Sequence, residues 1–151
     1  MAVRAEQRDE GNRRPELVRA AARLFRTKGF DATSTRDIAA AAEMQSGSPF
    51  YHFESKGALL HAVMKDGMAQ AAEHQQQALR ALGARASAQD KLRVLIRQHF
   101  EVLLGPGSDF IPVMLYEWRS LDAEQRQDIT AQKDAYEAAW MPARRALHRA
   151  G

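Results

Sequence analysis

The residues of this chain best suited to specific chemistry lie between Ser34 and Leu60, in the stretch STRDIAAAAEMQSGSPFYHFESKGALL. We interpret this stretch as two short helices joined by a tight turn, followed by an aromatic cluster and a lysine at the start of a new helix. That order is typical of a helix-turn-helix motif, whose first helix crosses the DNA backbone while its second presents N-terminal side chains to base edges. The chemistry expected here is non-covalent recognition of double-stranded DNA.

The first of the two short helices has a clear start signal. Ser34 is a favourable N-cap, and Asp37 follows three residues later, where its side chain completes a capping box. Ile38 and the alanines after it supply a small apolar face. We therefore predict a short helix after Ser34, and a turn made by Glu43 and Met44.

The second short helix is predicted to open at Gln45 or Ser46 and to continue through His52. Pro49 is compatible with this, because a proline in the first turn of a helix lacks only an N–H that would have no intrahelical partner. The small residues at 46–48 permit a close approach to DNA. The helix thus reads as the recognition helix of the motif.

The stretch resembles the DNA-binding domain of TetR-family transcriptional regulators, over roughly residues 13 to 65. The matching residues are Thr35-Arg36-Asp37-Ile38-Ala39, Gly47, Phe50-Tyr51-His52-Phe53, and Lys56 with Leu59. The resemblance implies a DNA-binding site composed of Thr35, Arg36, Gln45, Ser46, Gly47, Ser48, Phe50, Tyr51, His52 and Lys56. It further implies that Thr35, His52 and Lys56 bind phosphate and that Arg36 reaches a base or a phosphate. Ser46, Ser48 and Tyr51 would then lie on the recognition helix.

Two residues depart from the family pattern. Glu43 stands where the family usually has glycine, so it must adopt a left-handed conformation at about 1–2 kcal/mol or reshape the turn. Phe50 stands where a tyrosine often donates to phosphate, which removes that hydrogen bond. Phe50 and Phe53 are predicted to be the buried aromatic pair beside Tyr51.

The whole chain reads as an all-α protein. Apolar residues recur at helical spacing throughout its 151 residues, and strand signals are nearly absent. Helices are predicted over 13–28, 56–82 and 88–104, over 110–119, and from Asp122 onward with a kink at Pro142. We expect a tail at 1–12, a helix-turn-helix domain at 13–54, and a helical-bundle regulatory domain at 55–151.

Aromatic and thioether side chains are abundant in the predicted second domain. Most are expected to be core, and the remainder to line a ligand cavity between helices. The residues assigned to that cavity are Met68, His99, Phe100, Phe110, Met114, Trp118, Tyr136 and Trp140. By the family resemblance, a small apolar or acyl-type effector would bind there and lower the affinity for operator DNA.

Other classes of function find little support in the sequence. No nucleophile with a base, carboxylate pair or cofactor loop is visible, so no enzyme and no cofactor is expected. Five histidines show no metal-ligand spacing, and the chain has no cysteine. Neither a leader nor a membrane span is recognisable, and the net charge of +3 is small, so a cytoplasmic protein is expected. The alternative is a truncated helical protein-interaction module without independent high-affinity operator binding.

The family resemblance also concerns assembly. Family members bind palindromic operators as homodimers through a further pair of helices, and this sequence stops at Gly151, in or just after the helix before that pair. We expect from this a monomer or weak dimer, with exposed apolar surface along Tyr136, Trp140 and Leu147.

Overall fold

The computed structural model describes residues 13–151, and the predicted tail at 1–12 lies outside them. Within the described part, the chain is built from helices and connecting turns, without a strand. Two compact units are present. The head comprises residues 13–64 and 109–122, and the second unit comprises residues 65–108 and 123–151.

This division differs from the predicted boundary between residues 54 and 55. The first two turns of the long helix belong to the head, because Leu59, Leu60, Val63 and Met64 are all buried there. Residues 109–122 join the head as well, through the helix that begins at Phe110.

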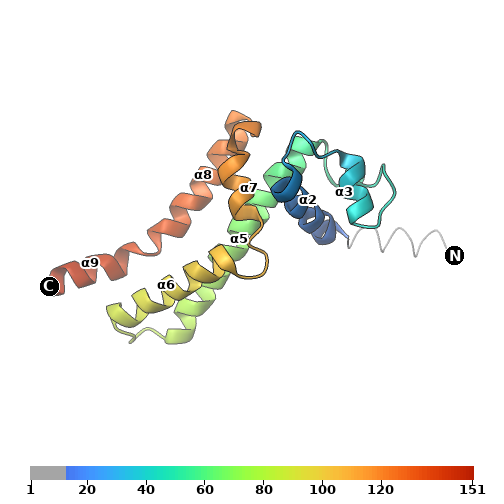
Figure 1. Ribbon diagram of the computed structural model, residues 1–151. Coiled ribbons are helices and arrows are strands. Elements are labelled where there is room, and N and C mark those ends of the chain that lie inside the picture. The colour runs from blue at the N-terminus through green and yellow to red at the C-terminus, as the bar shows by residue number, and fades with distance from the viewer. Residues whose placement is uncertain (1–12) are drawn as a thin grey trace. The chain divides into compact units, whose positions relative to one another are not determined.

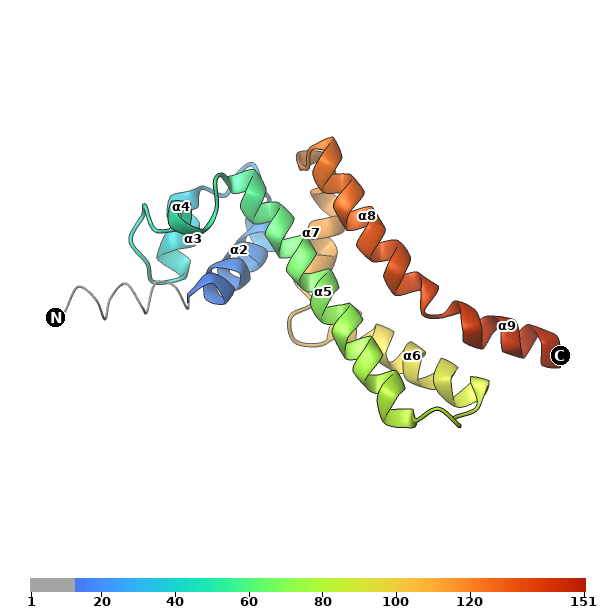
Figure 2. The same cartoon turned by 180° about the vertical axis from the view of Figure 1, so that it is seen from behind.

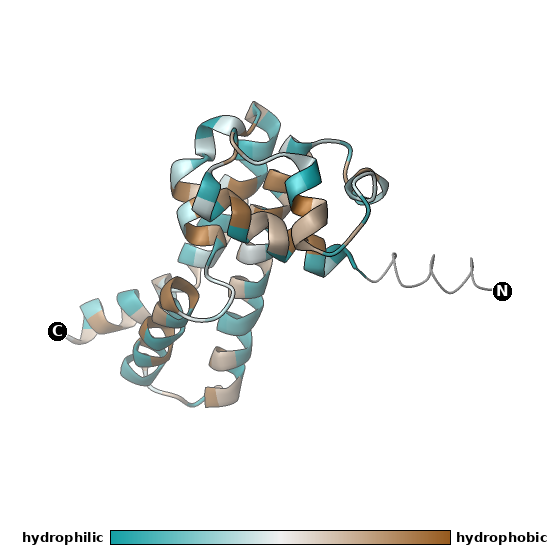
Figure 3. Cartoon of the chain, turned by 45° about the vertical axis from the view of Figure 1, so that its right-hand side comes forward, coloured by the Kyte–Doolittle hydropathy of each residue, from teal (hydrophilic) through white to brown (hydrophobic). Residues whose placement is uncertain are grey.

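The head contains α2 (Arg14–Lys28), α3 (Thr35–Ala41), α4 (Pro49–His52), the start of α5 (Lys56–Leu82), and α7 (Phe110–Tyr116), which is followed by a 3-10 turn at Trp118–Ser120. In this unit, α3 packs against α2 and α4, and α7 packs against another part of α2 (Figures 1 and 2). Hydrophobic and hydrophilic residues alternate along these helices, as amphipathic packing requires (Figure 3). The innermost side chains are Leu17, Phe25, Ile38, Leu59, Leu60, Met64 and Val113.

The start of α3 is capped as its sequence predicts. The Ser34 hydroxyl accepts the Asp37 N–H at 3.0 Å, and the Asp37 carboxylate accepts the Ser34 N–H at 2.9 Å. Both halves of the capping box are therefore present.

The turn after α3 confirms the prediction for Glu43, whose φ is 56°. Its N–H donates to the Ala40 carbonyl at 3.1 Å, and the Met44 N–H donates to the Ala39 carbonyl at 2.8 Å. A non-glycine residue thus occupies a left-handed position, where the contact of its Cβ with the backbone is unfavourable.

Recognition helix α4 begins later than predicted. Residues 46–48 form turns, and the helix starts at Pro49, where the fixed φ of proline suits a first helical position. Two short-range bonds lead into it, from Ser48 N–H to Gln45 O at 2.9 Å and from Phe50 N–H to Gly47 O at 3.2 Å.

The second unit contains the remainder of α5, together with α6 (Ala88–Leu104), α8 (Ala123–Ala138) and α9 (Met141–Ala150). α6 packs against α9, and α8 lies along α5 through an ion pair of 3.4 Å between Lys65 and Asp128. The buried Gln75 side chain donates to the Tyr136 carbonyl at 3.3 Å. The bounds predicted for α5 and α6 are confirmed.

The C-terminal helix was predicted with a kink, but the chain breaks into two helices instead. Pro142 lies in the first turn of α9, and it has no N–H to continue the hydrogen-bond ladder of α8. The expected apolar surface is also in another place. Tyr136 is buried, Trp140 and Leu147 are half-buried, and the exposed apolar side chains of this unit lie mainly on α6.

Among the apolar side chains of α6, Leu95 is fully buried. Leu92 is half-buried, while Ile96, Phe100 and Leu103 are exposed. One apolar face of α6 therefore has no covering partner within residues 13–151. Among residues 13–151, no helix is both long enough and apolar enough to cross a bilayer.

We predict that Glu43→Gly raises the melting temperature of the protein or leaves it unchanged. Glycine removes the left-handed strain, about 1–2 kcal/mol, and no described side-chain contact of Glu43 is lost. Ala40→Gly is the matched control, because Ala40 is exposed inside α3, where glycine costs about 1 kcal/mol. Thermal unfolding followed by circular dichroism measures both, and a lower melting temperature for Glu43→Gly would contradict the assignment of strain.

Candidate DNA-binding site

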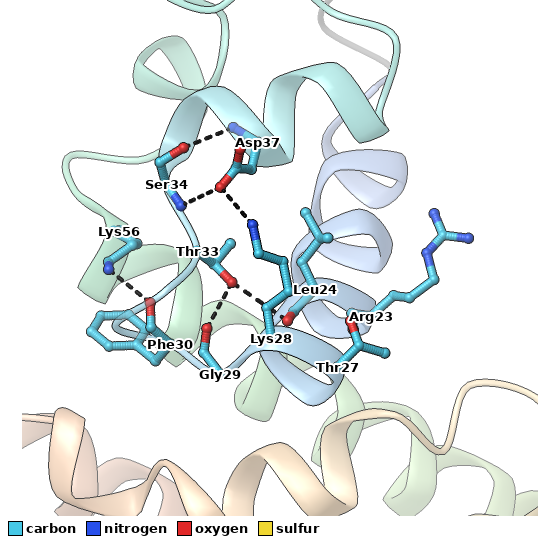
Figure 4. A network of polar contacts seen from close by, with 10 residues as sticks. All are labelled: Arg23, Leu24, Thr27, Lys28, Gly29, Phe30, Thr33, Ser34, Asp37 and Lys56. Carbon is cyan, nitrogen blue, oxygen red and sulfur yellow. Dashed lines mark hydrogen bonds and ion pairs between the residues drawn. The ribbon is translucent and has the colours of Figure 1, made fainter.

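The connection between α2 and α3 fixes the entry to the helix-turn-helix. Thr33 is buried, and its hydroxyl donates to the Gly29 carbonyl at 2.7 Å, with a longer contact to the Leu24 carbonyl (Figure 4). Gly29 has φ 86° and ψ 159°, a backbone conformation that is essentially restricted to glycine. The connection is thus held by a special backbone position and a buried hydroxyl.

Charge at the N-terminus of α3 is well organised. The Asp37 carboxylate accepts from the Ser34 backbone, and Lys28 Nζ donates to it at 3.2 Å. The Ser34 backbone bond, the Lys28 bond and the Ser34 hydroxyl together lower the pKa of Asp37 from 3.8 to about 2. The carboxylate therefore stays ionised at neutral pH and stabilises the positive end of the α3 dipole.

Most of the sequence-predicted recognition residues are exposed, but Ser48 is buried. Tyr51 is 83% exposed and Phe50 is 57% exposed, so the prediction that Phe50 is buried with Phe53 is wrong. The reason is the late start of α4: Ser48 and Pro49 are buried at its beginning, where Phe50 was expected to be. Gln45, Ser46, Gly47 and Arg36 are also exposed, whereas Thr35, His52 and Lys56 are half-buried.

Lys56 occupies a more constrained position than a surface cation. Its Nζ donates to the Phe30 carbonyl at 2.8 Å and lies 4.1 Å from the centre of the Phe30 ring. An ammonium has three donors, so this bond leaves others for an external acceptor. Lys56 thus keeps donors for an external acceptor while Phe30 holds its ammonium in place.

Sequence reasoning missed two arginines at the start of α2. The Arg13 guanidinium donates to the Ala42 carbonyl and, at 3.3 Å, to the Glu43 carbonyl, so it caps the C-terminal end of α3. The Arg14 guanidinium lies 5.3 Å from the centre of the Phe53 ring. Both contacts join segments distant in sequence, and no local pattern in the sequence indicates them.

The residues assigned to a ligand cavity fall into two separate units. Phe110, Met114 and Trp118 belong to the head, where Phe110 and Met114 are buried. Met68, His99, Phe100, Tyr136 and Trp140 belong to the second unit. The eight residues are therefore divided between the two units. The sequence analysis had placed all of them in one cavity of the second domain.

Three of them do meet in the second unit. His99 Nδ1 lies 3.1 Å from the Tyr136 hydroxyl, and the His99 ring lies edge-on to Trp140 with centroids 5.8 Å apart. Burial raises the pKa of the Tyr136 phenol. Phe100 is 55% exposed, and Met68 is buried.

A hollow of about 430 Å³ in the second unit has a different lining. Its walls come from Leu79 and Gly83 at the end of α5, from Leu95 on α6, and from Pro142 and Ala143 on α9. Arg80 and Lys91 also line it, and none of the eight predicted ligand residues does.

Within residues 13–151, no cluster of three histidine or carboxylate side chains is arranged to hold a metal ion. In the head, a capped helix (α3) and a tight turn are followed by a short helix (α4) whose outer side chains are exposed. This arrangement defines the class of helix-turn-helix DNA-binding proteins.

Comparison with known proteins identifies the family. Residues 17–63 match the model of bacterial regulatory proteins of the tetR family, and residues 85–151 match the tetracyclin repressor-like C-terminal domain. The chain belongs to the TetR family.

Three relatives illustrate the similarity. The HTH-type transcriptional repressor KstR2 of Mycolicibacterium smegmatis is 44% identical over 55 residues, which are 36% of this chain and 27% of that protein. A crystal structure of superantigen PfiT is 36% identical with a TM-score of 0.76, over 89% of this chain and 70% of that one. The crystal structure of AibR in complex with isovaleryl coenzyme A and operator DNA has 29% sequence identity to this chain and a TM-score of 0.69. The match covers 84% of this chain and 67% of AibR.

We predict that Tyr51→Ala and Lys56→Ala weaken DNA binding in different ways. Loss of Tyr51, an exposed side chain of α4, should relax sequence preference by about 1–3 kcal/mol at one position. Loss of the Lys56 ammonium should weaken binding to all sequences about equally and reduce the salt slope by about one. Fluorescence anisotropy with matched and mismatched duplexes at several salt concentrations separates the two effects.

Arg97→Ala provides the control for charge, because Arg97 is an exposed cation of α6 in the second unit. Its salt slope should equal that of the parent protein. If Tyr51→Ala and Lys56→Ala also behave like the parent, the recognition surface has been assigned to the wrong residues.

Proposed function

We propose that this chain is a sequence-specific DNA-binding transcriptional regulator that acts as a ligand-responsive repressor. The observation that carries the proposal is the exposed surface of α4, the helix that follows the turn at Glu43. Tyr51 is the most exposed large side chain of this surface. An aromatic phenol that is 83% exposed contributes little to folding, and it suits contact with base edges or backbone.

The proposed contacts follow the positions of the side chains. Arg36 and Thr35 at the start of α3, His52 at the end of α4 and Lys56 at the start of α5 would contact phosphates. Gln45, Ser46, Gly47, Phe50 and Tyr51 would approach the bases. Ser48 is buried, so its part is to hold the start of α4.

The assembly that would use this surface is a homodimer on a palindromic operator, in the cytoplasm. Each subunit would place one recognition helix in the major groove, with half-sites about one helical turn apart or a multiple of it. Joining two heads raises the effective concentration of the second head once the first is bound.

An acyl coenzyme A thioester is the proposed class of effector. Support comes from AibR, which has been crystallised with isovaleryl coenzyme A and operator DNA, at 29% identity to this chain. The effector would bind the state of the protein with low DNA affinity better than the state with high DNA affinity. It can shift the equilibrium between these two states by no more than that difference in its own affinity.

DNA binding is tested with a labelled duplex from the region upstream of the gene that encodes this chain. We expect saturable binding that exceeds binding to a shuffled duplex of equal length. The logarithm of the association constant should fall linearly with the logarithm of the salt concentration, because each phosphate contact releases counterions. Equal affinity for both duplexes would contradict the proposed sequence specificity.

The effector class is tested by adding isovaleryl and stearoyl coenzyme A to the preformed protein–DNA complex. An effector should lower DNA affinity by about 5- to 150-fold, the usual range of coupling between two sites. Free coenzyme A is the control for the nucleotide part, and the matching free acids are the control for the acyl part. If neither thioester alters DNA affinity, the acyl thioester assignment is wrong while DNA binding stands.

A further inference from the structure

The backbone of one residue in the head, Phe30, is held at both its N–H and its carbonyl by residues distant in sequence. The Phe30 N–H donates to Glu117 Oε1 at 3.0 Å, and the Phe30 carbonyl accepts from Lys56 Nζ at 2.8 Å. Glu117 directly follows α7 and Lys56 begins α5, so the Phe30 backbone links the two helices through the connection between α2 and α3. Figure 4 shows the Lys56 side of this link.

The ring of Phe30 strengthens the link to Lys56. Lys56 Nζ lies 4.1 Å from the ring centre, within the range of a cation–π contact. The other neighbour of the ring is Phe25, which is buried, with centroids 5.4 Å apart. A shift of Phe30 would therefore remove two interactions of the Lys56 ammonium at once.

The backbone at Gly29 directs the Phe30 N–H toward Glu117. Its φ of 86° and ψ of 159° are available to glycine alone. Space is not the limit, because a Cβ built on Gly29 would lie 3.5 Å from Glu117 Oε1, an ordinary contact. The conformation thus serves the orientation of the peptide.

Glu117 is itself held in place by α7. The Arg26 guanidinium donates to Asp109 at 2.5 Å just before α7, and Phe110 and Val113 are buried in the head. At the other end, the Glu117 N–H donates to the Val113 carbonyl at 2.9 Å. The carboxylate is half-buried at the end of a short, well-anchored helix.

We propose that Glu117 is a positioning residue of the DNA-binding surface, which acts through the backbone of Phe30 on Lys56. Its carboxylate fixes the Phe30 N–H, the Phe30 carbonyl and ring fix the Lys56 ammonium, and the ammonium meets a DNA phosphate. This inference rests on the proposed function for its last step, and its first two steps are independent of DNA.

The sign of the effect separates positioning from simple electrostatics. Removing a negative charge near DNA phosphates favours binding on charge alone, so electrostatics predicts tighter binding for both Glu117→Ala and Glu117→Gln. Positioning predicts the opposite for Glu117→Ala, because no acceptor remains for the Phe30 N–H. Glutamine keeps an oxygen acceptor at the same place and should restore binding.

We expect Glu117→Ala to weaken DNA binding about three- to tenfold, since a hydrogen bond to a charged group contributes more than a neutral one. Glu117→Gln should bind at least as tightly as the parent. Lys56→Ala should abolish the difference between alanine and glutamate at position 117, because coupled residues give non-additive effects. Glu137→Ala, at an exposed residue of α8, is the control for loss of a carboxylate and should match the parent.

Amide hydrogen exchange of Phe30, measured by NMR without DNA, tests the same link independently. Exchange should be at least tenfold faster in Glu117→Ala and close to the parent rate in Glu117→Gln. Unchanged exchange together with unchanged or tighter DNA binding in Glu117→Ala would overturn the inference. If the parent binds no DNA, the proposed function fails, and the exchange rates alone decide whether Glu117 positions Phe30.

Discussion

The head depends on anchoring two helices that are too short to be stable alone. Isolated helices of fewer than about 12 residues are marginal in water, and α3 and α4 have seven and four. Tertiary contacts supply what local propensity does not. Ile38 and Pro49 are buried, the capping box closes the start of α3, and the Arg13 guanidinium binds carbonyls at its end. The geometry of the recognition surface thus follows from contacts at both ends of α3.

These contacts explain why the site uses groups that serve two purposes. Asp37 caps α3 and pairs with Lys28, while Lys56 binds Phe30 and still has donors left for an external acceptor. A cation held by an internal carbonyl loses less conformational entropy on meeting a phosphate than a free lysine side chain does. The same arrangement makes the surface sensitive to residues that would never contact DNA.

Local signals in the sequence were sufficient for most helix boundaries. Ser34 with Asp37 predicted the start of α3, and the predicted range 56–82 matches α5. The positive φ of Glu43 was expected from the family resemblance, because Glu43 stands where the family usually has glycine. Side-chain burial was less predictable, because periodicity identifies an apolar face without showing whether another helix covers it. Phe100 on α6 is the clearest case, at 55% exposed.

The contacts of the candidate site that join distant segments were beyond sequence reasoning. Glu117 reaches Phe30 across 87 residues, and Arg13 reaches Glu43 across 30. Such pairs depend on how α7 and α2 pack, which no motif records. The family resemblance supplied the proposed recognition residues, whereas the contacts that support them became visible only in three dimensions.

Gly29 has a consequence for how this protein can vary. Every single-base change in a glycine codon that alters the amino acid introduces a Cβ, and the backbone at Gly29 tolerates none without strain. Glu43 shows the contrasting case, since its left-handed region is open to other residues at a modest penalty. Within this short motif, the turn at Glu43 can therefore accept other residues. The turn at Gly29 cannot accept any single-base substitution that changes the amino acid without strain.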